Sequence, residues 1–249
     1  DGVPIYVPYD GNLDLARILT NNLGAVEVSK GYSSLLQGPN QMGGAINITT
    51  QKPTKPLEAS LGYRQGWSRS QDNAYDMHAS FAASSDLGYL QVSGSQLKQD
   101  FLGLPHGVNN DIAGKHGKMI NSSADDKRGI VKLGFTPREN DEYTVTYIKQ
   151  DGEKDNPPYS GNSGQKSRYW QWPEYDKESF YYQGTTQLND RFTLKSRLYR
   201  DTFENTLMMY NSLADLKNKK GSSRHYSAYC DDAGLQLAVD VRANDLLSL

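Results

Sequence analysis

The stretch Ala25–Pro53 reads AVEVSKGYSSLLQGPNQMGGAINITTQKP, and the pattern of the chain changes just after it. Two pairs of β-branched residues alternate with polar or small neighbours: Val26 with Val28, then Ile46 with Ile48. This period of two predicts two strands, and the glycines between them supply the turns that fold one strand onto the other. Helical and strand patterns are mixed upstream, whereas only alternating strands follow. The stretch therefore predicts a boundary between two structural units.

The segment before this stretch combines an extended start with a short helix. Val3–Tyr9 holds two prolines, each of which pushes its predecessor toward an extended conformation. From Leu13 to Leu23, apolar residues follow the spacing of one helix face: Leu15, Ile18, Leu19 and Leu23. Residues 1–53 are thus expected to form a small α+β unit that starts within a motif, as a fragment would.

Eight strands are predicted from Leu57 onward. In one of them Val131, Leu133 and Phe135 alternate with Lys132 and Gly134, so that a slip of one residue would place a lysine on the apolar face. Short turns at 84–86, 136–140 and 189–190 alternate with long polar connections at 98–126, 151–177 and 201–232. Short turns at one rim and long loops at the other are typical of an outer-membrane barrel. A soluble antiparallel sandwich shares the alternation but has no reason to sort its loops by length.

Composition supports a sheet with one apolar and one polar face. Hydrophobic residues make up 36% of the chain, and tyrosine alone contributes 17 residues. No window approaches the ~18 consecutive apolar residues of a membrane-spanning helix, so any membrane crossing is expected to use strands. The formal charge of -2, with no basic stripe, gives no reason to expect nucleic acid as a partner.

Four short motifs resemble the TonB-dependent outer-membrane receptors. They are DGVP at 1–4, VEVSKG at 26–31, SSLLQG at 33–38 and, above all, GGAINITT at 43–50. The resemblance implies a membrane β-barrel, antiparallel and partial, preceded by a small α+β plug domain fragment. Residues 1–53 would be the C-terminal part of the plug, and residues 54–249 the N-terminal portion of the barrel, with about eight strands.

The same resemblance implies a function in nutrient uptake. Such a receptor takes up a scarce large nutrient across the bacterial outer membrane, most often a ferric siderophore, and otherwise haem or cobalamin. It works by binding and gating, driven by the TonB complex of the inner membrane through an N-terminal box that this chain lacks. Its surroundings are outer-membrane lipid and lipopolysaccharide. Plugged barrels have about 22 strands, so a chain with eight is expected to be a piece of a receptor.

By position in the family, the segment after the Asp-Gly turn contacts the ligand, which points to Tyr6, Tyr9, Asp10 and Asn12. The alternative is that these residues pack the plug against the wall. A second candidate is the aromatic run Tyr169, Trp170 and Trp172, either as a ligand platform or as part of the interfacial girdle or local loop packing.

Two charged residues are candidates for contact between plug and barrel. The family pattern has Arg where Lys30 stands, and Lys keeps the charge but loses the two-pronged hydrogen-bonding geometry. Glu27 lies close enough in sequence to pair with it. A cluster in the last long connection, Lys217, Lys219 and Lys220, is expected to be a solvated loop or else to attract anionic ligands or lipopolysaccharide phosphates.

Enzymatic chemistry is not expected. His78, His106, His116 and His225 are scattered without metal-ligand spacing, and no nucleophile, base and acid follow a catalytic pattern. We therefore predict no catalytic residue, no bound metal and no cofactor, and interpret Cys230 as an incidental thiol. Two other interpretations remain open. One is a small eight-stranded outer-membrane barrel with an adhesive or structural role, and the other is a soluble carbohydrate-binding sandwich.

Overall fold

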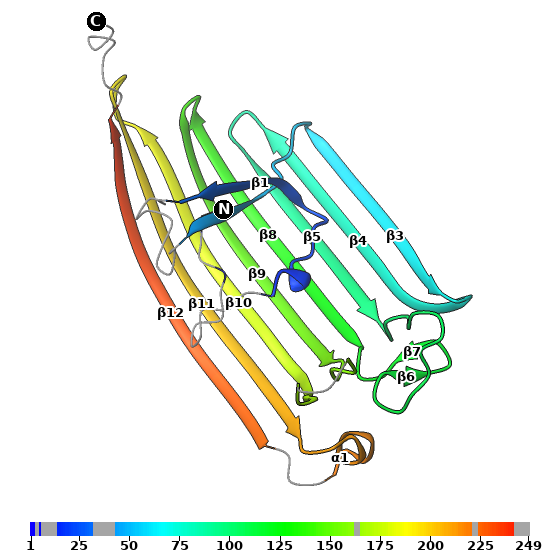
Figure 1. The fold of residues 1–249 in the computed structure, drawn as a ribbon. Helices are drawn as coiled ribbons and strands as arrows, with labels where there is room; N and C mark the ends of the chain where they lie inside the picture. The colour runs from blue at the N-terminus through cyan, green and yellow to red at the C-terminus, as the bar shows by residue number, and fades with distance from the viewer. Residues whose placement is uncertain (3–4, 6–13, 32–42, 162–164, 221–223, 242–249) are drawn as a thin grey trace, which may run out of the picture.

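The computed structural model describes residues 1–2, 5, 14–31, 43–161, 165–220 and 224–241. Its main feature is one curved antiparallel sheet of eight strands, in the order β12-β11-β10-β9-β8-β5-β4-β3 (Figure 1). The strands of this sheet are β3 (Leu57–Ser68), β4 (Gln71–Ser85), β5 (Gly88–Gln99), β8 (Ala124–Arg138), β9 (Asp141–Asn156), β10 (Tyr169–Gln187), β11 (Phe192–Tyr210) and β12 (Arg224–Val241). Strands adjacent in the sheet are thus neighbours along the chain, apart from a small insertion between β5 and β8.

The alternation in the sequence sets the two faces of the sheet. In the register of β8 with β9, Val131 lies opposite Tyr147 and Lys132 lies opposite Thr146, so apolar residues share one face and polar residues the other. Lys132 and Thr146 are buried under the N-terminal segment, whereas Val131 and Tyr147 are exposed. We call the face that carries Lys132 the inner face and the opposite one the outer face. The predicted registers are confirmed.

Connections differ between the two ends of the sheet. Short turns join β4 to β5, β8 to β9 and β10 to β11 at one end, which we call the turn end. At the other end, the loop end, the β5–β8 connection carries the hairpin of β6 (Gly114–Lys115) and β7 (Lys118–Met119), and the β11–β12 connection carries α1 (Leu213–Asn218). Figure 1 shows these insertions together at one end of the sheet.

Two of the long connections are shorter than predicted. β9 continues to Asn156 and β10 already begins at Tyr169. In the same way, β11 continues to Tyr210 and β12 already begins at Arg224. The prediction ended the strands where apolar alternation ended. Backbone hydrogen bonds between strands do not depend on apolar side chains, so the ladder continues into the polar segments. The aromatic run at 169–172 therefore lies in a strand and not in a loop.

The sheet is open. β3 and β12 lie at its opposite edges and do not pair with each other. This arrangement fits part of a larger barrel wall and excludes a closed eight-stranded barrel. Among the described residues there is also no second large sheet facing the first, as a sandwich would require.

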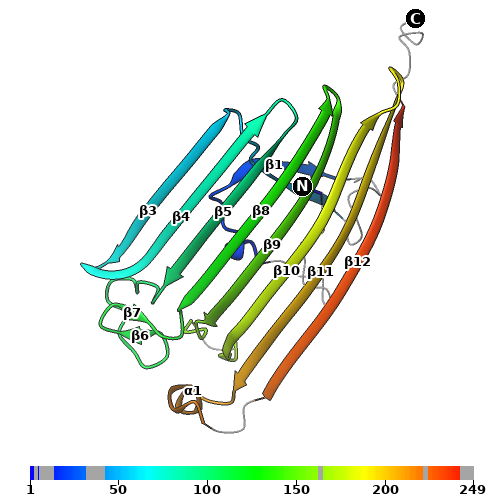
Figure 2. The same cartoon turned by 180° about the vertical axis from the view of Figure 1, so that it is seen from behind.

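A small hairpin lies across the inner face of the sheet, as Figures 1 and 2 show from opposite sides. It consists of β1 (Leu23–Lys30) and β2 (Gly44–Thr50), with Val26 opposite Ile48 and Val28 opposite Ile46. Gly44 has φ +147°, and a Cβ there would meet the Ser29 carbonyl oxygen at 2.2 Å. The second glycine of the Gly-Gly pair is therefore required by the close approach of the two strands.

The predicted helix from Leu13 to Leu23 is wrong in the described part of that range. Only a single 3-10 turn forms, η1 (Leu15–Arg17), and β1 already begins at Leu23. Other parts of the chain satisfy backbone groups that a helix would have used: the Gln150 side chain on β9 donates to the Arg17 carbonyl, and the amide of Gln51, the residue after β2, donates to the Asn22 carbonyl. Among the described residues, no helix is both long enough and apolar enough to cross a membrane.

Candidate functional site

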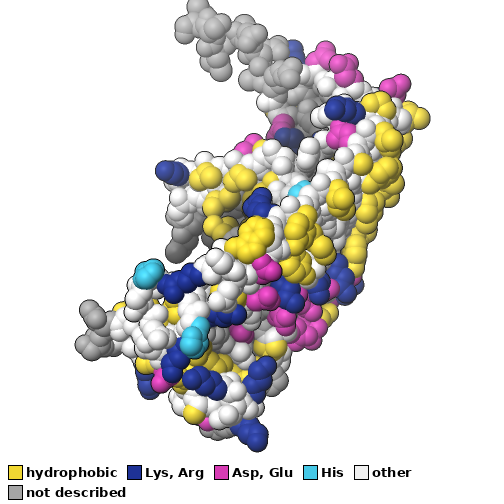
Figure 3. Space-filling model, turned by 90° about the vertical axis from the view of Figure 1, so that its right-hand side faces the viewer, with side chains coloured by type: hydrophobic (Ala, Val, Ile, Leu, Met, Phe, Trp, Pro, Cys, Tyr) yellow, Lys and Arg dark blue, Asp and Glu magenta, His cyan; other side chains and the backbone are white. Residues whose placement is uncertain are grey.

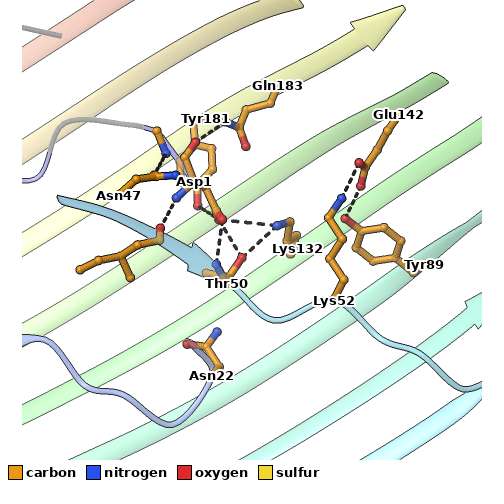
Figure 4. A network of polar contacts seen from close by, with 12 residues as sticks. Asp1, Asn22, Asn47, Thr50, Lys52, Tyr89, Lys132, Glu142, Tyr181 and Gln183 are labelled. Atoms are coloured by element: carbon orange, nitrogen blue, oxygen red, sulfur yellow. Dashed lines mark hydrogen bonds and ion pairs between the residues drawn. The ribbon is translucent and has the colours of Figure 1, made fainter. Parts of the chain in front are cut away.

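The N-terminal segment and the inner face meet in three groups of polar contacts. The first is central and surrounds the Asp1 carboxylate (Figure 4). That carboxylate accepts hydrogen bonds from the Thr50 amide at 2.8 Å, the Thr50 hydroxyl at 2.7 Å and the Tyr181 hydroxyl at 3.0 Å. Lys132 Nζ lies 3.5 Å from it. Three parts of the chain that are far apart in sequence, residue 1, the end of β2 and the centre of the sheet, are thereby joined.

Burial makes this central group important for stability. The side chains of Lys132 and Asp1 are only 3% and 6% exposed. Lys132 also donates to the Thr50 hydroxyl at 2.9 Å, and the Gln183 amide donates to the Asp1 carbonyl. A buried charge without a partner is far more costly than a paired one. Each charge therefore depends on the other to remain in place.

The second group lies nearer the loop end and holds the segment around η1. Arg17 Nη1 donates to Asp126 Oδ1 at 3.3 Å, with both side chains about 95% buried. The guanidinium also lies over the Tyr175 ring, 4.0 Å from its centroid. Lys154 Nζ lies 2.5 Å from the Asp14 carboxylate. Three adjacent strands, β8, β9 and β10, thus each hold the same short turn of the N-terminal segment.

A glycine on β9 makes room for this group. A Cβ on Gly152 would lie 2.5 Å from Asp126 Oδ1 and 2.9 Å from Arg17 Nη1. Any larger residue would have to displace one of the two charged groups. Gly152 is therefore needed for a contact to which it contributes no side chain.

The third group consists of weaker amide contacts and one exposed ion pair. Asn21 donates to Asp76 on β4 at 3.3 Å, and Asn22 donates to Ser93 on β5 at 3.5 Å. Toward the turn end, Lys52 pairs with Glu142 at 2.5 Å, and Glu142 also accepts from the Tyr89 hydroxyl at 2.9 Å. These contacts extend the interface from β10 as far as β4.

The residues predicted for plug and barrel contact lie elsewhere in the described structure. Glu27 and Lys30 are both on β1 with exposed side chains. Glu27 accepts a hydrogen bond from Asn47 at 3.2 Å, within the hairpin. Their contact with a barrel wall remains a prediction.

The predicted ligand-contact residues fall into two sets. Tyr6, Tyr9, Asp10 and Asn12 lie outside the described residues. Trp172 pairs with Lys154 in the sheet, so the two share the inner face. Trp170 lies two residues earlier in the same strand and is therefore on the same face. The two indole rings meet edge to face at 6.0 Å, and Arg168 lies over Trp170 at 4.6 Å. By alternation Tyr169 falls on the opposite face.

Sequence reasoning missed the most buried members of the interface, which are Asp1, Arg17, Thr50, Asp126, Lys132 and Tyr181. The strand pattern does place Lys132 on the polar face, which is the one available signal. It cannot indicate which polar residue meets which part of the N-terminal segment, because such contacts join positions 82 to 180 residues apart. Among the described residues, no group of three or more His, Cys, Asp or Glu side chains could hold a metal ion.

Comparisons with known proteins agree with this arrangement. Residues 1–45 match the family model described as TonB-dependent Receptor Plug Domain. The copper transporter OprC has a similar structure, with a TM-score of 0.62 and 20% sequence identity over 88% of this chain and 31% of that chain. At this identity the likeness concerns the fold. No curated protein sequence matches the chain.

These findings confirm two predictions from the sequence. The plug match supports the relationship to the TonB-dependent receptors, and the likeness to OprC supports a partial barrel wall. This chain spans about a third of the length of OprC. η1 and β1 fall within the matched residues 1–45, whereas β2 extends past them to Thr50, and all three elements lie on the inner face.

Proposed function

We propose that this chain, which is related to the TonB-dependent receptors, forms the C-terminal part of the plug and the first strands of the barrel in a ligand-gated importer of the outer membrane. The observation that carries the proposal is the buried contact of Asp1 and Thr50 with Lys132 and Tyr181. It holds the plug segment across a polar inner wall. The plug then blocks the barrel until its polar contacts are exchanged for others.

The outer face supports a position in a membrane. Large apolar side chains project from it on every strand of the sheet, and several are more than half exposed, for example Leu61 at 86% and Leu235 at 67%. An exposed apolar surface of this extent is unusual for a protein in water. On a barrel wall it is the surface that contacts lipid hydrocarbon. We place the domain boundary between plug and barrel at residues 53 and 54, just before β3.

Ligand contact is assigned to the loop end of the inner face. Trp170 and Trp172 offer two flat aromatic surfaces there, and Arg168 adds a positive charge. Lys154, which pairs with Trp172, contacts Asp14 of the plug segment. A ligand on the tryptophans therefore lies next to the group of ion pairs that holds the plug. The plug residues Tyr6, Tyr9, Asp10 and Asn12 complete this proposed site.

An aromatic and cationic surface suits an anionic iron chelate such as a ferric siderophore. Work on the plug comes from the TonB complex of the inner membrane. The transport step is then the breaking and re-forming of plug contacts, with no covalent chemistry.

The test is deletion of the gene that encodes the full-length receptor, followed by growth on single nutrient sources. We expect loss of growth on one ferric siderophore, restored by the intact gene. Loss of copper uptake instead would support the importer function but would identify copper, and not a siderophore, as its substrate. Indifference to siderophores, haem, cobalamin and copper would overturn the proposal.

A further inference from the structure

A small polar pocket lies between the N-terminal segment and the inner face, where Asn21 and Asn22 cover the sheet. Hydrophobic side chains gather instead along the outer face, which Figure 3 shows from the side of β3. The pocket contains a row of residues across three strands: His78 on β4 lies opposite Ser95 on β5, which lies opposite Arg128 on β8. Its empty volume is about 240 Å³, including space open to solvent.

Two buried nitrogen atoms of this row have no hydrogen-bond partner, Arg128 Nε and His78 Nδ1. Within the described part of the chain, Arg128 forms no ion pair either. The ring of His78 is fixed close to the backbone of β3, since a Cβ on Gly62 would meet its Cε1 atom at 2.1 Å. A guanidinium with a buried nitrogen and no counter-charge is costly in free energy. The pocket therefore lacks a negative charge that would stabilise it.

The acidic residues on this part of the wall already have other partners. Asp126 lies two residues before Arg128 on the same face of β8, and its carboxylate pairs with Arg17. Asp76 on β4 accepts a hydrogen bond from Asn21 at 3.3 Å. The described residues that line the pocket include no carboxylate. A bound anion is therefore the remaining way to balance the charge of Arg128.

We propose that the pocket binds a chloride ion, which joins the N-terminal segment to the wall. Arg128 balances its charge and donates charge-assisted hydrogen bonds to it. Neutral donors complete the site: the Ser95 hydroxyl, His78 Nδ1–H, and the side-chain amide of Asn22, which uses only one of its two N–H groups on Ser93 at 3.5 Å. A monovalent anion fits because the site supplies one positive charge. The ion then adds a contact that holds residues 21–22 against β4, β5 and β8.

The experiment measures release of the N-terminal segment from the full-length receptor in mild detergent, by protease cleavage within residues 1–53. Each protein is compared in sodium chloride and in sodium gluconate of equal ionic strength. An ion at about ten times its dissociation constant favours the bound form about tenfold, so cleavage of the wild type should be about tenfold slower in chloride. Arg128→Met should remove this difference. Lys127→Met, which removes a charge from the outer face of the same strand, is the matched control and should keep it.

Bromide in place of chloride allows the ion to be observed directly. Crystals of the wild-type receptor grown in sodium bromide should show anomalous scattering from an ion beside Arg128, a result that does not depend on the folding of any variant. Water alone in the pocket would overturn the inference, and so would a chloride effect that survives Arg128→Met or disappears equally in Lys127→Met. The inference concerns docking of the two units, so a receptor that imports no nutrient would contradict the proposed function and leave both measurements intact.

Discussion

At the scale of single residues, the interface depends on a few buried groups whose partners lie far away in the sequence. Strand alternation alone places Lys132 on the polar face, whereas nothing in the sequence pairs it with Asp1. Similarly, Arg17 lay within a helical pattern that gave no sign of Asp126. Sequence periodicity reports which face a residue occupies, but contacts between the plug and the wall depend on how the two units dock.

Lys132→Met tests the central group. The substitution leaves the Asp1 carboxylate buried without its cation, and removal of one partner from a buried pair costs about 3 to 5 kcal/mol. We expect the plug segment to detach at lower urea concentration, as measured by protease cleavage within residues 1–53. Adding Asp1→Asn should recover part of the loss, because the unpaired charge is then gone. Additive effects of the two substitutions would contradict direct pairing.

Gly152→Ala tests the group around η1. The added methyl group would meet Asp126 Oδ1 and Arg17 Nη1 well inside contact distance. Overpacking of this kind costs about 1 to 3 kcal/mol, so the same protease assay should show earlier release of the plug. Gly129→Ala is the matched control, since a Cβ there has no neighbour within 4 Å. An equal effect of both alanines would argue against steric conflict at the ion pair.

The two tryptophans of the inner face provide a test of ligand contact. Trp170→Ala with Trp172→Ala should weaken binding of the transported nutrient by about 30-fold or more, because aromatic residues at binding sites often contribute about 2 kcal/mol or more. Trp67→Ala, an exposed position on the outer face of β3, serves as the control. Isothermal titration with detergent-solubilised receptor gives both affinities. Unchanged affinity in the double variant would place the ligand elsewhere.

At the scale of elements, the strands are predictable from the sequence, whereas the conformation of the segment predicted as a short helix is not. Strand alternation is enforced by two different environments on the two faces, and every strand of the sheet repeats it. The pattern from Leu15 to Leu23 looked helical because apolar spacing of three and four arises easily in a short segment. In the structure Leu15 is exposed and Arg17 is buried, the reverse of what the helical pattern implies. Contacts with the wall decide the conformation there.

A pair of substitutions on β9 tests the two environments of the outer face. Val145 lies in the apolar part of this face, and Glu153 lies on the same face nearer the loop end, opposite Asp125 of β8. Val145→Arg should impair assembly into the membrane, since an arginine facing lipid near the midplane costs about 2 to 4 kcal/mol. Glu153→Arg should be tolerated. The readout is the amount of heat-modifiable receptor in isolated outer membranes, and equal amounts for the two variants would show that this face does not contact lipid.

At the scale of the whole molecule, the chain joins two units with opposite demands on polar groups. The wall has an apolar outer face and a polar inner face, and the plug segment forms buried hydrogen bonds with the inner face through Arg17 and Thr50. Strong pairing keeps the plug in place, and its polar character allows water or a ligand to replace the contacts one at a time. A purely apolar interface would offer no such exchange.

The most direct test of this account is a reversible covalent link between plug and wall. Asn22 Nδ2 lies 3.5 Å from Ser93 Oγ on β5, so Asn22→Cys with Ser93→Cys places a thiol on each side of this contact, in a background where Cys230→Ser removes the one cysteine of this sequence. Nutrient uptake by cells with the full-length receptor is measured after oxidation and again after reduction. The account predicts that uptake stops in the oxidised receptor and returns on reduction, whereas undiminished uptake with the link formed would contradict it.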